Sequence, residues 1–238
     1  HIIYFNTSDN NLMYTVLSDD TPSNDWTNWE VPVVIDSEAQ ANVGLWAKAV
    51  INDNDDIHVI YRSGTDSISH LFSPSSDSPT RTWSKSTLVD DSYTKSDLSL
   101  ALDSSGNPHA VYYRHGSHDV IHASAEAHCC YKPSRWIWSI EPIDANAEVG
   151  LGASLAIGSD DTLHVSYHDE TNGSLKYASR AFSSQFNGWS NWHTSTIDKP
   201  SNGDIVGRYT DIIVTDTGSV YIAYYDESTG DLKLALGE

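Results

Sequence analysis

The sequence is poor in sulfur, in basic residues and in long apolar runs. Among its 238 residues are two cysteines and one methionine, and 13 Lys and Arg stand against 33 Asp and Glu, for a formal net charge of -20. A field of this sign repels nucleic acid, anionic lipid and sulfated or uronic polysaccharides unless a local basic patch overrides it. No apolar run approaches the roughly 18 residues of a membrane-spanning helix. We therefore expect no nucleic-acid partner and no membrane span.

The two cysteines are adjacent, at Cys129 and Cys130, and they follow His128. Neighbouring Cα atoms lie about 3.8 Å apart, below the roughly 4.4–6.8 Å of an ordinary disulfide. The alternatives are a vicinal disulfide ring, two free thiols, a bond to another chain, or a thiolate metal site with His128 or His122. No CxxC and no second cysteine cluster supports a complete zinc site. An oxidising environment favours the vicinal or the intermolecular disulfide.

Helical periodicity is also missing, and a repeat takes its place. One marker position recurs at spacings of 57, 51, 55 and 57 residues, at His1, His58, His109, His164 and Tyr221. Each unit holds several short apolar runs separated by turns rich in Asp, Asn, Ser and Gly. A repeat of this length with several β-runs is typical of propeller blades. We predict an all-β fold, a β-propeller of five blades of about 51–57 residues, in a single domain over residues 1–238.

Each predicted blade has four strands. The first is a continuous apolar run, and the second carries the marker and then a tyrosine three residues later, at Tyr4, Tyr61, Tyr112, Tyr167 and Tyr224. Because both faces of a blade are covered by its neighbours, we expect these tyrosines to pack between blades. A fold repeats its packing residues, whereas an active site breaks the symmetry. The recurring histidine is therefore interpreted as structural, with a hydrogen bond to the adjacent turn.

Two stretches, SLALDSSGNPHAVYY from Ser99 and SLAIGSDDTLHVSYHDETNGSLKYA from Ser154, carry a resemblance. They resemble the β-propeller repeats of secreted and cell-surface bacterial and archaeal proteins, and distantly the NHL-type blades. The resemblance covers nearly the whole chain and implies the fold. It does not imply one function, because propellers include lectins, lyases, hydrolases and scaffolds.

The strand count leaves two open positions. The first unit begins at its second strand, and the last unit, which ends at Glu238, lacks a fourth strand. The native chain could continue beyond both ends, the two blades could be three-stranded, or another subunit could cover the open edges. The last alternative predicts a homo-oligomer or filament.

The approach to each first strand is predicted to line the central channel. Aligning VGLWAKAVI, YTKSDLSLAL, VGLGASLAI and VGRYTDIIV puts Trp46, Asp97, Gly152 and Tyr209 at one level, with Lys48, Ser99, Ser154 and Asp211 two residues on. Alternation along a strand points both rows the same way. Aromatic rings beside polar groups suit a sugar. We predict a ligand-binding rim of Trp46, Lys48, Asp97, Arg208, Tyr209 and Asp211.

Three functions remain open at this point. The leading one is an extracellular, non-catalytic module that recognises neutral glycans or another cell-surface partner. A structural surface protein that self-assembles through propeller edges is an alternative. The third is a carbohydrate-active enzyme: a glycosidase with Asp97 and Asp211 as its carboxylates, or a polysaccharide lyase, since propeller lyases use His, Tyr and Arg. No catalytic residue is assigned, because the sequence holds none of HExxH, GxSxG or a P-loop.

Secretion is predicted because the sequence begins with His1 rather than Met, which we interpret as the removal of a signal peptide. Asn6 and Asn172 begin formal glycosylation sequons. No cofactor is expected, although acidic turns such as NDNDD at 52–56 could bind Ca²⁺ without matching an EF-hand loop.

Overall fold

The structure is a computed structural model that describes residues 1–17, 28–37, 44–64, 67–77, 81–89, 98–128, 135–146, 148–183, 188–201 and 203–237. Regular structure in these ranges is almost wholly β-strand, and no α-helix occurs in them. A 3₁₀ turn spans Ser75–Asp77. Among the described residues no helix is long and apolar enough to cross a membrane. The predicted all-β class is confirmed.

The chain divides into two compact units, His1–Asp91 and Ser92–Glu238. The first unit holds two antiparallel sheets, in the strand orders β1-β2-β3 and β4-β5-β6-β7. The strands are β1 (Ile2–Asn6), β2 (Asn11–Thr15), β3 (Val33–Asp36), β4 (Leu45–Ile51), β5 (Ile57–Ser63), β6 (Ser67–Ser73) and β7 (Ser84–Val89).

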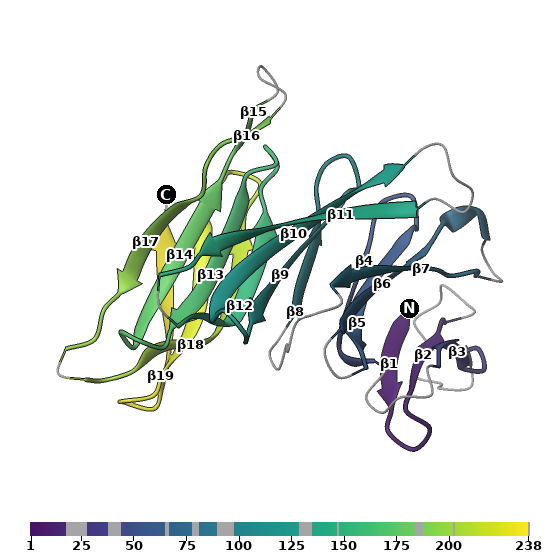
Figure 1. The fold of residues 1–238 in the computed structure, drawn as a ribbon, viewed down its shortest axis with the longest axis horizontal. Helices are drawn as coiled ribbons and strands as arrows, with labels where there is room; N and C mark the ends of the chain where they lie inside the picture. The colour runs from purple at the N-terminus through teal and green to yellow at the C-terminus, as the bar shows by residue number, and fades with distance from the viewer. Residues whose placement is uncertain are drawn as a thin grey trace. The chain divides into compact units, whose positions relative to one another are not determined.

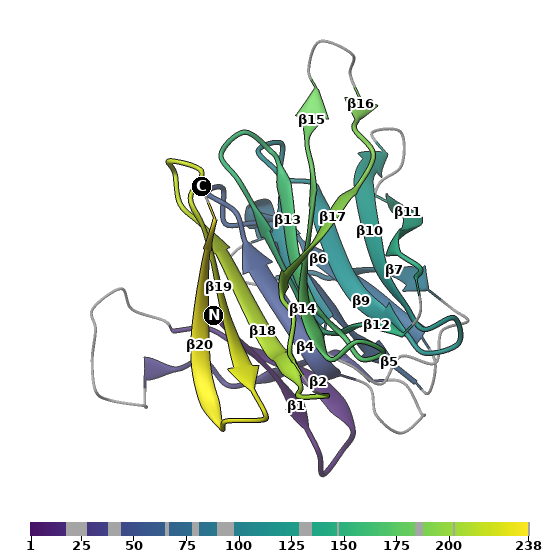
Figure 2. The ribbon, with the colours of Figure 1, turned by 90° about the vertical axis from the view of Figure 1, so that its left-hand side faces the viewer.

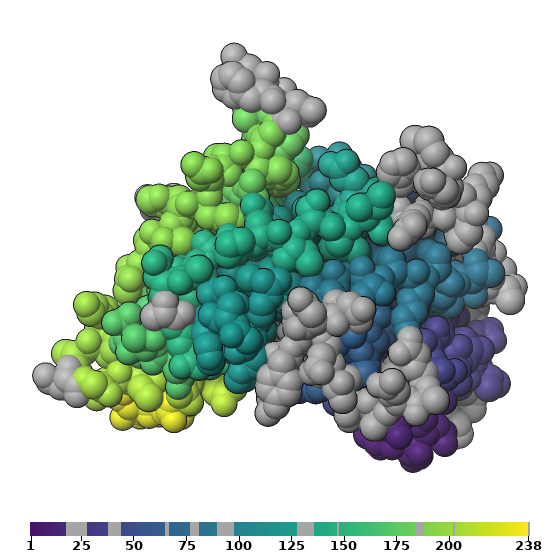
Figure 3. All heavy atoms as spheres, in the orientation of Figure 1, coloured from purple at the N-terminus to yellow at the C-terminus, as the bar shows by residue number. Residues whose placement is uncertain are grey.

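The second unit holds three larger antiparallel sheets, in the orders β11-β10-β9-β8, β12-β13-β14-β17 and β18-β19-β20, and a small hairpin β15-β16. Figures 1 and 2 show how these sheets stack within the unit. The strands are β8 (Leu98–Leu102), β9 (Pro108–Arg114), β10 (Asp119–His128), β11 (Arg135–Asp144), β12 (Val149–Ile157), β13 (Leu163–Asp169), β14 (Ser174–Arg180), β15 (Phe182–Ser183), β16 (Gly188–Trp189), β17 (His193–Asp198), β18 (Val206–Val214), β19 (Val220–Asp226) and β20 (Asp231–Gly237). In Figure 3 the light green segment of β15 and β16 stands out from the body of this unit.

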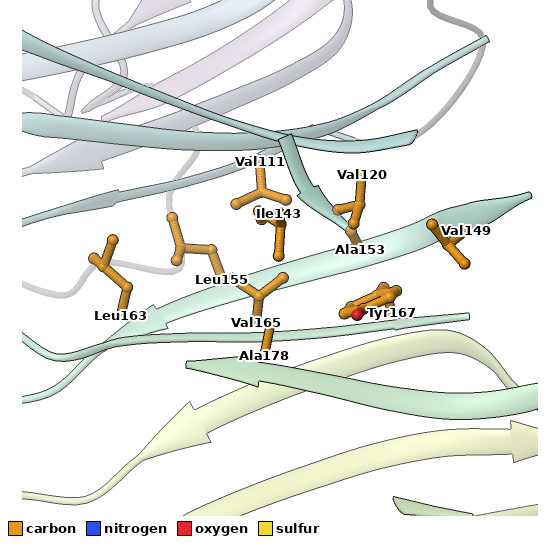
Figure 4. Packing of buried hydrophobic residues seen from close by; sticks show 10 residues of the cluster. All are labelled: Val111, Val120, Ile143, Val149, Ala153, Leu155, Leu163, Val165, Tyr167 and Ala178. Atoms are coloured by element: carbon orange, nitrogen blue, oxygen red, sulfur yellow. The ribbon is translucent and has the colours of Figure 1, made fainter. Parts of the chain in front are cut away.

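The core of the second unit lies between its sheets. Val111 and Ile143 of one sheet face Leu155, Val165 and Tyr167 of the next, and all five are at most 6% exposed (Figure 4). In the first unit a matching cluster joins Leu12 and Tyr14 of β2 to buried residues of β5. The second strands β5, β9 and β13 are buried almost throughout and need no polar alternation. The first strands are less covered than predicted, because Ile51 of β4 and Ile213 of β18 are 45% and 59% exposed.

The repeated tyrosines connect consecutive sheets. The hydroxyl group donates to the aspartate that closes the last strand of the preceding sheet. Three such pairs lie among the described residues: Tyr61–Asp36, Tyr167–Asp144 at 2.9 Å and Tyr224–Asp198 at 2.7 Å. Packing of these tyrosines between sheets is thus confirmed. Tyr4 differs, because it is 38% exposed.

The repeated histidines have a different partner from the one predicted. Each Nδ1 atom contacts a residue of the next strand along the chain. The pairs are His1–Tyr14 (2.7 Å), His58–His70 (3.1 Å), His109–His122 (2.9 Å) and His164–Tyr177 (2.7 Å). The prediction of a hydrogen bond to the turn is therefore wrong for Nδ1. The structural role stands, since a histidine in four equivalent positions contacts the neighbouring strand each time.

The two terminal sheets have three strands each in the described residues, as the repeat predicts. The outer strand β20 leaves Leu232, Leu234 and Leu236 at least 60% exposed. Whether another strand or subunit covers this edge, and whether the chain forms an oligomer, stay predictions.

We expect the free energy of unfolding to fall when the pH drops below about 4, the ordinary range of an aspartate. Burial raises the pKa of Asp144, but hydrogen bonds from Lys176, Asn146 and Tyr167 lower it further, so its net pKa lies below the ordinary value. A depressed pKa means that the ionised form stabilises the fold above the unfolded-state pKa, and that this contribution is lost as the pH falls.

Urea unfolding followed by circular dichroism at about pH 7, 5, 4 and 3 measures this loss. Asp144→Asn should be less stable at pH 7 and should lose less stability between about pH 5 and pH 3 than the parent protein does. Equal losses in both proteins would contradict the assignment to Asp144.

Candidate active site

The predicted rim positions are structurally equivalent. In β4, β12 and β18 the pairing register shifts at the same point, and Trp46, Gly152 and Tyr209 each take a positive φ there, of 52°, 62° and 53°. A bulge of this kind re-aims a side chain. Tyr209 is 74% exposed and lies against Tyr225, with ring centroids 6.4 Å apart.

Not every predicted rim residue shares a neighbourhood. Arg208, Tyr209 and Asp211 lie together on β18, and Asp211 accepts a hydrogen bond from Ser154 Oγ at 3.1 Å. Trp46 and Lys48 lie on β4 of the first unit, where the Arg62 guanidinium lies 5.3 Å from the centre of the Trp46 ring. Asp97, Cys129 and Cys130 lie outside the described residues. One rim that joins all these residues stays a prediction.

The position opposite each bulge breaks the repeat. It directly follows the repeated tyrosine, and its occupants are Phe5, Arg62, Tyr113, His168 and Tyr225. Register pairs Arg62 with Leu45, His168 with Leu151 and Tyr225 with Arg208. Sequence analysis did not predict this row as part of a site. The signal was present in the sequence, because the residue after each repeated tyrosine changes from unit to unit while the tyrosine itself does not.

A hydrogen-bonded relay is built on this row at the end of β9. The His118 Nδ1 atom lies 2.8 Å from the Tyr113 hydroxyl, which donates to Glu148 Oε1 at 3.2 Å. Because that hydroxyl has one proton, its oxygen accepts the Nδ1–H of His118. This assignment leaves the His118 Nε2 with a lone pair, on a side chain that is 49% exposed.

The surroundings keep Tyr113 protonated. Burial and the nearby Glu148 carboxylate raise the pKa of Tyr113 far above its ordinary range. The backbone of His118 is fixed on both sides: its N–H donates to Arg114 at 2.8 Å, and its carbonyl accepts from Val149 of the next sheet at 3.0 Å. An exposed imidazole nitrogen that is oriented through Nδ1 has the geometry of a general base.

A second polar group continues the surface. Arg208 binds Glu170 through Nη2 at 3.2 Å and Glu227 through Nη1 at 3.1 Å. The buried His168 donates from Nδ1 to the Val206 carbonyl at 2.9 Å, and burial lowers its pKa while Glu170 opposes that shift.

The backbone joins the two groups. The Glu170 N–H donates to the Glu148 carbonyl at 2.9 Å, and the Glu148 N–H donates to Thr171 Oγ1 at 3.0 Å. The polar groups of three consecutive sheets of the second unit are therefore connected through Glu148 and Glu170. They include an exposed histidine, His118, and the guanidinium group of Arg208.

Metal and modification sites stay predictions. The described residues hold no group of three or more His, Cys, Asp and Glu side chains arranged to bind a metal ion. The Asn6 side chain donates to Asp9 at 3.1 Å and that of Asn172 donates to Asp169 at 2.9 Å. Asn6 ends β1, and Asn172 lies in the turn between β13 and β14.

No protein-family model and no curated protein matches the chain. Solved structures do. An ulvan lyase of a polysaccharide lyase family, PL25, matches with a TM-score of 0.60 at 11% identity over 97% of this chain, and its complex with -[GlcA(1-4)Rha3S]- with a TM-score of 0.59. The intramolecular trans-sialidase from Ruminococcus gnavus matches with a TM-score of 0.52 at 11% identity over 90% of this chain. The chain spans 64% of the lyase and 48% of the trans-sialidase.

These likenesses correct the functional prediction. The solved structures that share the fold are carbohydrate-active enzymes, which contradicts the leading interpretation of a non-catalytic recognition module. The predicted fold class is confirmed, whereas the number of blades and the single domain stay predictions. The chain has the all-β propeller fold, in the form that carbohydrate-active enzymes also use.

Proposed function

We propose that this chain is the catalytic propeller, or part of it, of a polysaccharide lyase that cleaves a uronate-containing polymer by β-elimination. The relay of His118, Tyr113 and Glu148 carries the proposal, because it presents an exposed imidazole base in a fixed tautomer. The fold shared with an ulvan lyase supports it.

The chemistry assigns each group a step. The His118 Nε2 takes the proton on the carbon next to the uronate carboxyl group, the bond from the neighbouring carbon to the leaving sugar oxygen breaks, and a carbon–carbon double bond forms. The exposed Tyr209 hydroxyl gives a proton to the leaving oxygen. The proton on His118 then returns the tyrosinate to tyrosine through solvent. Tyr113 and Glu148 are positioning residues for His118.

The uronate carboxylate needs a positive charge, and two guanidinium groups compete for this role. Arg208 is neutralised by Glu170 and Glu227. Arg114 ends β9 directly after Tyr113, and its side chain has no hydrogen bond or ion pair to the rest of the described chain in the structure. We therefore assign the substrate carboxylate to Arg114.

The net charge of -20 opposes an anionic polymer, but only at long range. Salt at about 0.15 M screens exposed charges beyond roughly 8 Å, so the local guanidinium decides binding once the polymer is in contact. A polysaccharide is too large to enter a cell, so an enzyme that cleaves one fits the predicted extracellular location.

The test is a panel of polysaccharides with and without uronate, incubated with the 1–238 chain. We expect ultraviolet absorbance from an unsaturated uronate together with new reducing ends on one or more uronate polymers. New reducing ends without that absorbance would establish a hydrolase and contradict the elimination. Neither signal on any polymer would contradict a lyase activity of this chain.

A further inference from the structure

A pocket lies in the second unit, near the turns that join β8 to β9 and β12 to β13. Its volume is about 300 Å³, and its walls include Asp103, His109, Glu126, Asp161, Phe182 and Trp189. Ligand pockets of this volume are at the small end of the usual range, which suits one sugar unit. Tyr113, His118 and Arg208 are absent from its walls.

The pocket is next to a repeated histidine pair whose third-strand member, His122, contacts charged residues. The His122 Nδ1 atom lies 3.1 Å from Glu141 Oε1, and Glu141 also binds Arg180 of the next sheet. In three other sheets the residue that pairs with the position equivalent to His122 is uncharged: it is Val33, Ser86 or Ser195, where this sheet has Glu141. By the symmetry argument, packing does not require a carboxylate here.

Arg180 also fixes the aromatic wall. Its guanidinium lies 5.6 Å from the ring centre of Trp189 and 5.7 Å from that of Trp192. Phe182 contacts Trp189 edge to face, at 5.1 Å between ring centres. The wall that Trp189 and Phe182 form is thus held in place before any ligand arrives.

The hydrogen bonds assign the protons at the pocket floor. Glu141 can only accept, so His122 carries its proton on Nδ1, and burial keeps the pKa of His122 well below its ordinary value. The neutral His122 therefore accepts at Nε2 from the Nδ1–H of His109, at 2.9 Å. The remaining nitrogen of His109, Nε2, faces Asp103 Oδ2 at 3.6 Å.

That distance is too long for a hydrogen bond. The Asp103 carboxylate and the His109 Nε2 atom face each other at the wall of the pocket, and the same carboxylate oxygen accepts from the Asn107 side chain at 2.9 Å. Burial raises the pKa of Asp103, but its interactions with His109 and Asn107 lower it more, so the carboxylate is ionised at neutral pH. An ionised carboxylate at a pocket wall attracts a positively charged donor.

The remaining charged groups select the kind of donor. Asp103, Glu126 and Asp161 line the pocket, and none of the described residues that line it is Lys or Arg. An anionic sugar would meet like charges. A metal ion does not fit, because no three candidate ligands converge among the described residues. An ammonium group supplies several donors and a positive charge, and tryptophan faces attract cations and sugar rings alike.

We propose that this pocket binds an amino sugar, with its ammonium group at Asp103 and His109 and its ring against Trp189. This site is independent of the proposed lyase chemistry, because it uses other residues at other turns.

Calorimetry with the 1–238 chain at neutral pH tests the proposal with glucosamine trimer, N-acetylglucosamine trimer, glucose trimer and cadaverine. A charge-assisted hydrogen bond lost on acetylation should weaken binding about tenfold or more. We expect glucosamine trimer to bind best. Equal affinity for the acetylated trimer would overturn the ammonium assignment. Cadaverine binding as tightly as glucosamine trimer would overturn the sugar assignment, and no binding of glucosamine trimer would overturn both.

Variants place the site. Glu126→Gln removes an exposed carboxylate of the wall and should weaken glucosamine trimer binding about tenfold. Asp231→Asn, at the start of β20 and away from the pocket walls, is the matched control and should bind as the parent does. Trp189→Ala should abolish binding while the circular dichroism spectrum is retained. If Trp189→Ala unfolds, the comparison of Glu126→Gln with Asp231→Asn decides. Equal affinities of these two variants for glucosamine trimer would contradict binding at this pocket.

Discussion

His118→Ala should lower the kcat of polymer cleavage by about 10²–10⁴-fold, the usual contribution of a positioned general base. The variant removes the nitrogen that takes the proton and leaves Tyr113 and Glu148 in place. Folding should be little affected, since the side chain is 49% exposed. The measurement is the initial rate of ultraviolet absorbance on the polymer that the panel identifies, at saturating substrate.

The matched control is His193→Ala. This histidine is exposed on β17 of the neighbouring sheet and has no part in the relay. It should cleave at the parent rate. A His118→Ala variant that keeps more than about a tenth of the parent kcat would contradict the assignment of the base.

Tyr113→Phe separates positioning from chemistry. It removes the hydroxyl that contacts both His118 Nδ1 and Glu148, leaves the direct 3.2 Å contact of His118 Nδ1 with Glu148 Oε1, and keeps the ring that fills the buried position. A positioning residue should change kcat and leave KM near the parent value, because the substrate still binds. A rise in KM with kcat unchanged would show that Tyr113 acts in binding instead.

Much of the fold could be predicted from the sequence because its signals are local. The marker spacing and the turn composition repeat with each sheet, and the three-stranded terminal sheets follow from the same count. The tyrosine contacts could be predicted for the same reason. A residue that recurs at Tyr61, Tyr167 and Tyr224 performs the same packing each time.

The site was less predictable because it depends on register. The alignment did place Trp46 and Tyr209 at one level, and the structure puts both at equivalent bulges. The His118 relay was missed because its three members come from a strand end, a turn and the next sheet, which only the fold brings together. The contact of His109 Nδ1 with His122 was missed because cross-strand pairing with a residue 13 positions later leaves no local pattern.

Glycines carried a signal that sequence reasoning also passed over. Val-Gly precedes the bulge at residues 43–44, 149–150 and 206–207. Gly44, Gly150 and Gly207 all have positive φ, of 101°, 113° and 88°, and each lies against a strand of the preceding sheet, at Leu12 of β2, Val120 of β10 and Leu175 of β14. The aligned sequences contain this glycine, but only the structure shows why glycine is needed: two sheets approach each other closely at this position.

Gly150→Ala should lower the free energy of unfolding by about 3–5 kcal/mol, the sum of backbone strain at positive φ and of overpacking. An added Cβ would lie 2.5 Å from the Val120 Cβ and 2.8 Å from the Val120 Cα. The second of these atoms is backbone, so rotation of a side chain cannot relieve the contact. Val120 is fully buried between β9 and β11, which leaves the sheet no room to shift.

Urea unfolding followed by circular dichroism measures this effect. Gly116→Ala is the matched control, because an added Cβ there meets nothing within 4 Å. It should change stability by less than about 1 kcal/mol. Gly207→Ala should repeat the loss, since its Cβ would lie 2.6 Å from the Leu175 Cα. Because the same close approach recurs in two sheet pairs, a loss at Gly150 without one at Gly207 would limit the explanation to one junction. Equal stability of Gly150→Ala and Gly116→Ala would show that the sheets do not pack as closely as described.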